Sequence, residues 1–270
     1  MSRAVFPQFL VAATCLGLTA CATAPAENRS RIVDVPLAST HADIAFSITT
    51  GSRQRAPCED SANCPAQSEM EPAMRFALQV QRVAGALQDG AQYLYPDLAQ
   101  RAPGLVDSRF DVYVVEGDEP GSASSANGRV ALNAALGKWQ PYDDWLAFVI
   151  AREMGHIIAR HHEENSAASI ATSMLMNVLV PGSSLLKSLI SAGGSQIASI
   201  SKRDVQRQEA DKIAFDLLKA SGYRMRDVSL SLLTATAALD DGQWSKSFRK
   251  SSETLLADAL NSEIAVASLM

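Results

Sequence analysis

Apolar residues recur three or four positions apart in several stretches of the chain, which is the spacing of an amphipathic helix. One such stretch occupies residues 69–90 and ends at Gly90, a residue type that often closes helices. Another runs from Trp145 to Glu164 and is so rich in apolar residues that it predicts a long, mostly buried helix. Asp143 and Asp144 precede it and can cap its first turn.

Further helices are predicted toward the C-terminus. Their helical spacing covers residues 203–220, 226–239 and 249–261. Residues 166–186 carry no charged side chain and are interrupted by Pro181-Gly182. That stretch is too polar and too broken for a membrane-spanning helix, so a pair of buried core helices is favoured. A hairpin that touches the membrane or covers a groove is the alternative.

Strand patterns are few and short. Residues 110–115 read FDVYVV, whose β-branched and aromatic content predicts a strand, and residues 129–132 predict a second one. Residues 117–128 are rich in Gly, Ser and Asp, which predicts a loop. Residues 44–48 read IAFSI and predict a short strand or an irregular arm. Together these patterns predict a predominantly helical α+β fold with a small sheet beside the long helix.

Composition adds limits to this picture. The 270 residues are 47% hydrophobic and 20% charged, enough to bury a core and unlike a disordered chain. The formal net charge is −5 without a cluster of Lys and Arg, which argues against nucleic acid as a partner.

The N-terminus has the pattern of a secretion signal. Arg3 precedes a short apolar run, residues 9–20, which is about half of the ~20 residues that a spanning helix needs. The run ends Leu18-Thr19-Ala20-Cys21, which resembles the lipobox of bacterial lipoproteins. The resemblance implies cleavage before Cys21 and lipidation of its thiol. An ordinary secretory signal, with Cys21 a bystander, is the alternative.

Compartment and cysteine pairing follow from that signal. Position 22 is Ala rather than Asp, which in similar lipoproteins favours the outer membrane. The periplasm is oxidising. Cys15 leaves with the signal and Cys21 is acylated, so Cys58 and Cys64 are expected to form a disulfide. Two surface thiols are the alternative.

The chemistry of greatest interest lies in the long helix, where residues 152–156 read R-E-M-G-H. A zinc peptidase helix carries two His at positions i and i+4, so that both rings face one metal ion, and a Glu beside the first His as general base. The metal lowers the pKa of its bound water to about 7. Here Glu153 and His156 fit that pattern, and Arg152 stands where the first His belongs.

The flanking sequences resemble the HtpX/BepA-like family of gluzincin metallopeptidases, over about residues 75–260. The similarity is carried by NGRVALNAAL at 127–136, LAFVIA at 146–151, GHIIARHH at 155–162 and QEAD at 208–211. The resemblance implies a zincin-like fold, a zinc cofactor and an endopeptidase of envelope protein quality control. It also implies that residues 127–136 form a substrate-binding edge strand.

Residue by residue, the resemblance gives an incomplete site. Glu153 matches the general base and His156 the second zinc ligand, whereas Arg152 replaces the first ligand. The third ligand lies four residues before Asp211 in the family, and Arg207 stands there. Arginine offers no lone pair to a metal, and one His alone does not hold zinc, so zinc is expected to be absent or weakly bound.

Substitute ligands are scarce on the same grounds. His161 and His162 follow His156 by five and six positions, so without a break in the helix they point away from it. A site of His156, Glu153 and Glu209 needs a shifted geometry. Glu209 lies two residues before Asp211 and therefore faces a different side of its helix.

The two arginines themselves have a physical use. Glu153, Glu209 and Asp211 are available to pair with Arg152 and Arg207, which would join two helices without a metal. If the carboxylates do not neutralise both arginines, the groove is expected to bind an anionic group such as a peptide C-terminus.

The favoured interpretation is a lipid-anchored pseudo-peptidase that faces the periplasm and binds unfolded or outer-membrane polypeptides. An active zinc endopeptidase with rearranged ligands and a purely structural lipoprotein are the alternatives. The expected parts are a signal peptide at 1–20, a lipidated Cys, tether and arm at 21–66, and a metallopeptidase-like domain at 67–270.

Overall fold

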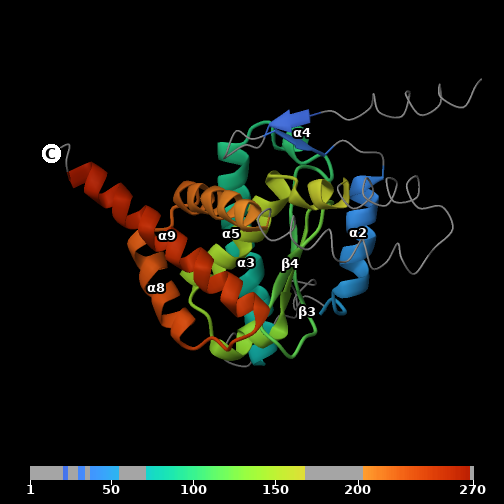
Figure 1. Cartoon of the computed structure of the whole chain (residues 1–270). Helices are drawn as coiled ribbons and strands as arrows, with labels where there is room; N and C mark the ends of the chain where they lie inside the picture. The colour runs from blue at the N-terminus through green and yellow to red at the C-terminus, as the bar shows by residue number, and fades with distance from the viewer. Residues whose placement is uncertain (1–20, 24–29, 34–36, 55–70, 168–202, 268–270) are drawn as a thin grey trace, which may run out of the picture.

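The computed structural model describes residues 21–23, 30–33, 37–54, 71–167 and 203–267 (Figure 1). The predicted signal peptide, the Cys58–Cys64 disulfide and nearly all of the uncharged stretch at 166–186 lie outside these residues.

A small mixed sheet has the strand order β3-β5-β4. Strands β3 (Asp111–Val115) and β5 (Arg129–Asn133) are parallel, and β4 (Ser122–Ser124) pairs with β5 in the antiparallel sense. The two predicted strands are confirmed. The expectation that residues 127–136 form an edge strand was wrong, because β5 lies between β3 and β4, and β4 is the edge strand beside it. The expectation of loop throughout residues 117–128 was wrong at β4, because a three-residue edge strand of Ser and Ala leaves no hydrophobic alternation to recognise.

Helices cover both faces of this sheet (Figure 1). Val112 and Val114 belong to the main core, together with residues of the helices α3 (Pro72–Leu94) and α5 (Asp143–Ile158). On the other face, Tyr113 packs with Phe46 of α2 (Ala38–Thr49) in a smaller cluster. The sheet is therefore the middle layer between α2 and the main helical core.

Helix α2 corrects the prediction for residues 44–48, which are neither a strand nor an irregular arm. Among the side chains of α2 that the structure describes, those of Ala38, Ala42 and Phe46 are buried. They are spaced four apart, so one face of a helix is buried, and the apolar run IAFSI concealed that longer period.

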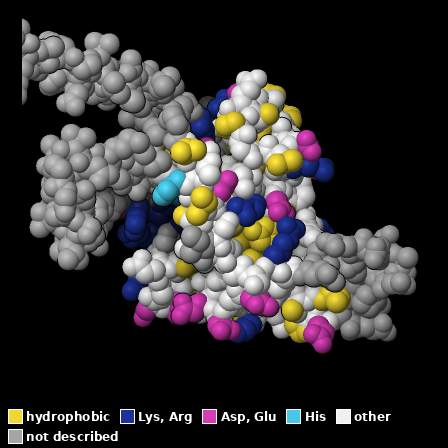
Figure 2. All heavy atoms as spheres, turned by 90° about the vertical axis from the view of Figure 1, so that its right-hand side faces the viewer, with side chains coloured by type: hydrophobic (Ala, Val, Ile, Leu, Met, Phe, Trp, Pro, Cys, Tyr) yellow, Lys and Arg dark blue, Asp and Glu magenta, His cyan; other side chains and the backbone are white. Residues whose placement is uncertain are grey.

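Basic side chains pack against the aromatic rings of the smaller cluster between α2 and the sheet. The guanidinium of Arg53 lies 4.3 Å from the ring centre of Tyr113, and that of Arg129 lies 4.9 Å from that of Phe46. Figure 2 views the molecule from the α2 side and shows Lys and Arg side chains gathered around hydrophobic ones. These cation–π contacts cover the smaller cluster.

The core centres on α5 (Asp143–Ile158), which packs against α3 (Pro72–Leu94). After its first turn almost every residue of α5 is buried. Asp143 belongs to the first turn, with Tyr142 as the cap residue, and its carboxylate accepts hydrogen bonds from Arg82 of α3. A carboxylate at this end of the helix interacts favourably with the helix dipole.

The predicted helix from Trp145 to Glu164 is in fact two helices. The first ends at Ile158, Arg160 adopts a left-handed conformation with φ 56°, and residues 161–167 form a new helix. The break turns the following residues back toward α5.

The C-terminal helices occupy residues 203–220, α8 (Met225–Ala237) and α9 (Gln243–Ala267). All three helices were predicted, but α9 extends beyond the predicted range 249–261 at both ends. Gly222, with φ 82°, ends the first of them. Among the described helices, none is long and apolar enough to cross a membrane.

Shorter elements complete the described chain. They are β1 (Cys21–Thr23), which pairs antiparallel with β2 (Ser30–Ile32), then α4 (Leu98–Arg101) and the 3-10 helix η3 (Ala134–Trp139).

Candidate functional site

A cavity of about 590 Å³ opens between α5, β4, the start of α9 and the helix at residues 203–220. Its wall includes Arg152, Glu153, His156 and Arg207, so the structure brings the predicted positions from both sequence motifs to one place.

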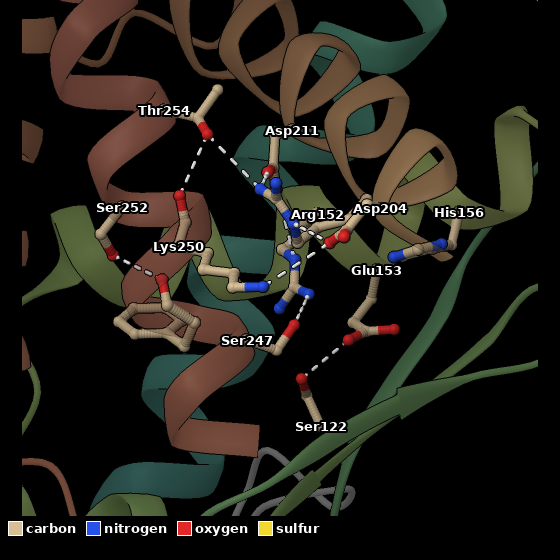
Figure 3. Close-up of polar contacts among 12 residues, drawn as sticks. Ser122, Arg152, Glu153, His156, Asp204, Asp211, Ser247, Lys250, Ser252 and Thr254 are labelled. Carbon is tan, nitrogen blue, oxygen red and sulfur yellow. Dashed lines mark hydrogen bonds and ion pairs between the residues drawn. The ribbon is translucent and has the colours of Figure 1, made fainter. Parts of the chain in front are cut away.

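The two arginines meet at the carboxylate of Asp211, and Figure 3 shows Arg152 and Asp211 beside Ser247. Nε of Arg152 lies 3.3 Å from Oδ1 of Asp211, and Nη1 of Arg207 donates to Oδ2 of Asp211 at 2.8 Å. Helix α9 supports both side chains, because Arg152 donates to Ser247 at 2.7 Å and Arg207 to Thr254 at 3.4 Å. The cluster thus joins α5, the helix at 203–220 and α9.

Asp211 is buried to 1% side-chain exposure at the centre of this cluster. Burial raises the pKa of its carboxyl group above the ordinary value, and the charges of Arg152 and Arg207 act in the opposite direction. Its ionised form therefore depends on the two guanidinium groups.

Glu153 is held by serines of the edge strand. Ser122 and Ser124 donate to its two carboxylate oxygens at 2.8 and 2.7 Å, and Ser122 in turn accepts a hydrogen bond from Nε1 of Trp244. Burial raises the pKa of Glu153, but His156, Arg152 and the two hydroxyl donors outweigh it, so the pKa falls below its ordinary value. Glu153 is thus a buried anion with both oxygens hydrogen-bonded.

The break after α5 brings the histidines together. Nδ1 of His156 lies 2.9 Å from Nδ1 of His161, and Nε2 of His161 lies 3.1 Å from Oε2 of Glu209. His162 meets the hydroxyl of Ser124 at 2.9 Å. The sequence predicted that these rings approach each other only if the helix is interrupted. The left-handed conformation of Arg160 is that interruption.

His156 and His162 are held in their neutral form. Burial lowers the pKa of His156 well below 6.5, and the neighbouring His161 and Arg152 lower it further, against the opposing charge of Glu153. Burial also lowers the pKa of His162.

A central helix with this motif, beside a small sheet whose edge strand borders the cavity, defines a zincin-like metallopeptidase domain. Residues 92–253 match Peptidase family M48, and the chain belongs to this family. The resemblance found in the sequence is thereby confirmed.

Curated relatives share part of this region. The chain is 27% identical over 128 residues to the Beta-barrel assembly-enhancing protease of Yersinia pestis, a match that covers 44% of this chain and 26% of the relative. The protein of the same name from Escherichia coli (strain K12) is 25% identical over the same length and coverage. The chain thus aligns with about a quarter of the length of these relatives.

Peptidases of family M48 depend on zinc, and the described residues do not fit that ion. Guanidinium groups stand at two of the three positions that the resemblance predicts for zinc ligands, and they offer no lone pair. Nδ1 of His156 is directed at another ring nitrogen. Among the described residues, no group of three or more His, Cys, Asp or Glu side chains is arranged to hold a metal ion.

The sequence did not decide which carboxylate pairs with the two arginines, and in the structure it is that of Asp211. Glu209 contacts His161, and Glu153 contacts the two serines of β4. The catalytic role of Glu153 and the ligand role of His156 stay predictions. Sequence reasoning missed Ser122, Ser124 and Ser247, because serine is common and no spacing links β4 or α9 to the motif.

Proposed function

We propose that this protein is a zinc-free member of its family, which binds polypeptides in the inherited groove instead of cleaving them. The observation that carries the proposal is the pair Arg152 and Arg207, which stand at two ligand positions and share the carboxylate of Asp211. A positive cluster with its own counter-ion takes the place of a metal ion.

The edge strand supports polypeptide binding. Gly121 and Ser125 hydrogen-bond to β5 through their backbones, and the alternation of an antiparallel pair directs the backbone groups of Ser122 and Ser124 away from β5. In the part of the chain that the structure describes, β4 pairs on one side only. An extended peptide can add to such an edge by main-chain hydrogen bonds.

The cellular role follows from the relatives and the N-terminus. The relatives' name refers to β-barrel assembly, which supports a role in envelope protein quality control on unfolded or outer-membrane polypeptides. The lipobox-like sequence that ends at Cys21 supports an anchor in the outer membrane, facing the periplasm. Fatty-acid labelling that persists in Cys21→Ser would exclude this anchor.

Zinc content tests the proposal. We expect the full-length protein, purified without chelator, to hold far less than one zinc per chain in elemental mass spectrometry and to leave an unfolded protein substrate uncleaved. The double variant Arg152→His, Arg207→Glu restores the ligand set and should take up about one zinc per chain.

The control is a third change, His156→Ala, which should abolish the zinc uptake of the double variant. One zinc in the wild-type protein, lost in His156→Ala, together with cleavage lost in Glu153→Gln, would instead establish the rearranged-ligand peptidase. Circular dichroism of each variant shows whether it is folded.

A further inference from the structure

We infer that the arginine-bearing end of this cavity binds the C-terminal carboxylate of a polypeptide that lies along β4. The inference rests on the proposed polypeptide binding and names the chemical group that the groove selects.

The charges of the cavity wall favour an anion. Its cationic side chains are Arg152, Arg203, Arg207, Lys246 and Lys250. Two carboxylates, Glu153 and Asp204, line the same wall. Five cations and two carboxylates therefore line the wall itself, so the surface that a ligand meets is positively charged.

The carboxylates nearby are already engaged. Asp211 is shared by Arg152 and Arg207, and both oxygens of Glu153 accept serine hydroxyls. Asp204 lies 3.7 Å from Arg207 and 3.8 Å from Lys250, so it too serves two cations. Each of these aspartates is shared by two cations, so neither fully neutralises its partners. An incoming anion is therefore attracted by the positive charge that is left.

Two of the cations have no such partner. Among the described residues, Arg203 and Lys246 lie within salt-bridge distance of no acidic side chain. Both are exposed at the cavity, where long-range attraction of a charged ligand is effective.

Arg152 supplies the fixed donor. Its side chain is 8% exposed and is held by Ser247, so its guanidinium is oriented before a ligand arrives. A guanidinium can bind a carboxylate through two parallel N–H···O hydrogen bonds, and opposite charges attract each other in addition. A terminal carboxylate is therefore expected to bind more strongly here than the neutral carbonyl of an internal peptide bond.

The position of β4 favours a terminus over an acidic side chain. Trp244 bonds to Ser122, which ties the start of α9 to that end of β4 and brings Lys246 and Ser247 close to it. Side chains of an added strand stand perpendicular to the sheet, whereas the terminal carboxylate continues the backbone. Strand pairing and charge recognition then act on the same main chain.

Fluorescence anisotropy with the full-length protein tests the inference. The probe is an extended, dye-labelled peptide with a free C-terminus, and its amidated form is the comparison. The free acid should bind at least about tenfold more tightly, the size expected of a charge-assisted hydrogen bond. Lys246→Ala should lower the affinity for the free acid and leave the affinity for the amidated peptide unchanged.

The matched control is Lys219→Ala, which removes one exposed Lys from the helix at 203–220 away from the cavity wall and should alter neither affinity. Equal binding of acid and amide overturns the inference and leaves the proposed function standing. If neither peptide binds, both the inference and the proposed polypeptide binding are overturned. Displacement of the free acid by equimolar inorganic phosphate shows a general anion site and also overturns the inference.

Discussion

At the scale of single residues, Asp211 is the anion that joins Arg152 and Arg207 in the candidate site. Its carboxylate is nearly inaccessible and contacts guanidinium groups from α5 and from its own helix. Burying three charges costs solvation energy, so the cluster is no proof of high stability. Removing the single anion, however, leaves two buried cations without their shared counter-ion.

Asp211→Ala is therefore expected to lower the free energy of unfolding by about 3–5 kcal/mol. Urea denaturation followed by circular dichroism measures the change. Asp204→Ala is the matched control, because Asp204 also contacts Arg207 but is 51% exposed, and it should cost at most about 1 kcal/mol. Equal effects of the two substitutions would contradict the role given to Asp211.

How far the sequence predicts this centre differs from residue to residue. The resemblance to the metallopeptidase family placed Arg152, Arg207 and Asp211 together, and the spacing of four residues puts Arg207 and Asp211 on one face of their helix. The choice of Asp211 over Glu209 and Glu153 depends on how the helices cross and on side-chain rotamers, and neither is encoded in spacing.

At the scale of elements, the contact between α5 and the helix at 203–220 depends on a missing side chain. A Cβ atom at Gly155 would lie 2.6 Å from the carbonyl oxygen of Ala210 and 3.1 Å from its Cα. Both neighbours are backbone atoms, so a side chain there would force the helices apart. This close approach brings Glu209 and Asp211 within reach of the residues around α5.

Gly155→Ala should therefore destabilise the protein by about 1–3 kcal/mol, although Ala is the better helix former by about 1 kcal/mol. Gly85→Ala is the control, because its added Cβ in α3 meets nothing within 4 Å. This control should stabilise the protein by about 0.5–1 kcal/mol. Thermal unfolding of both variants measures the difference, and a stabilising Gly155→Ala would show that the helices are free to separate.

Long, periodic elements were predictable and short or irregular ones were not. The helical spacing of α3, α8 and α9 survives in the sequence because each buries one face. The break at Arg160 has no Gly or Pro to announce it, and it decides where His161 points. Tertiary packing, rather than local preference, sets that conformation.

At the scale of the whole molecule, aromatic packing supports the walls of the site. Phe248 of α9 lies with its ring centre 5.9 Å from that of Phe148 and 6.2 Å from that of Trp145, both in α5. Trp244 stacks on the same ring at 5.0 Å. Because α9 is fixed to α5 by this cluster, the cavity keeps its shape through side-chain packing.

The neutral histidines then make global stability depend on pH. His156 faces His161, His162, Glu153 and Arg152, and the sum of burial and these charges keeps its pKa well below 6.5. Below about pH 6.5 the unfolded chain binds protons that the folded protein does not bind. The stability contributed by neutral His156 is therefore complete above that pH and is lost as the pH falls toward the folded-state pKa.

Between pH 7 and pH 5 we expect the free energy of unfolding to decrease, by at most about 1.4 kcal/mol per pH unit for each histidine held neutral. Glu153 does not contribute in this range, because its lowered pKa confines its effect to more acidic pH. Urea titrations at several pH values measure the slope, which should become shallower in His156→Gln. In the control His41→Asn, which alters an exposed imidazole bonded to Ser166, the wild-type slope should persist. An unchanged slope in His156→Gln would mean that His156 takes up its proton in the folded protein as readily as in the unfolded chain.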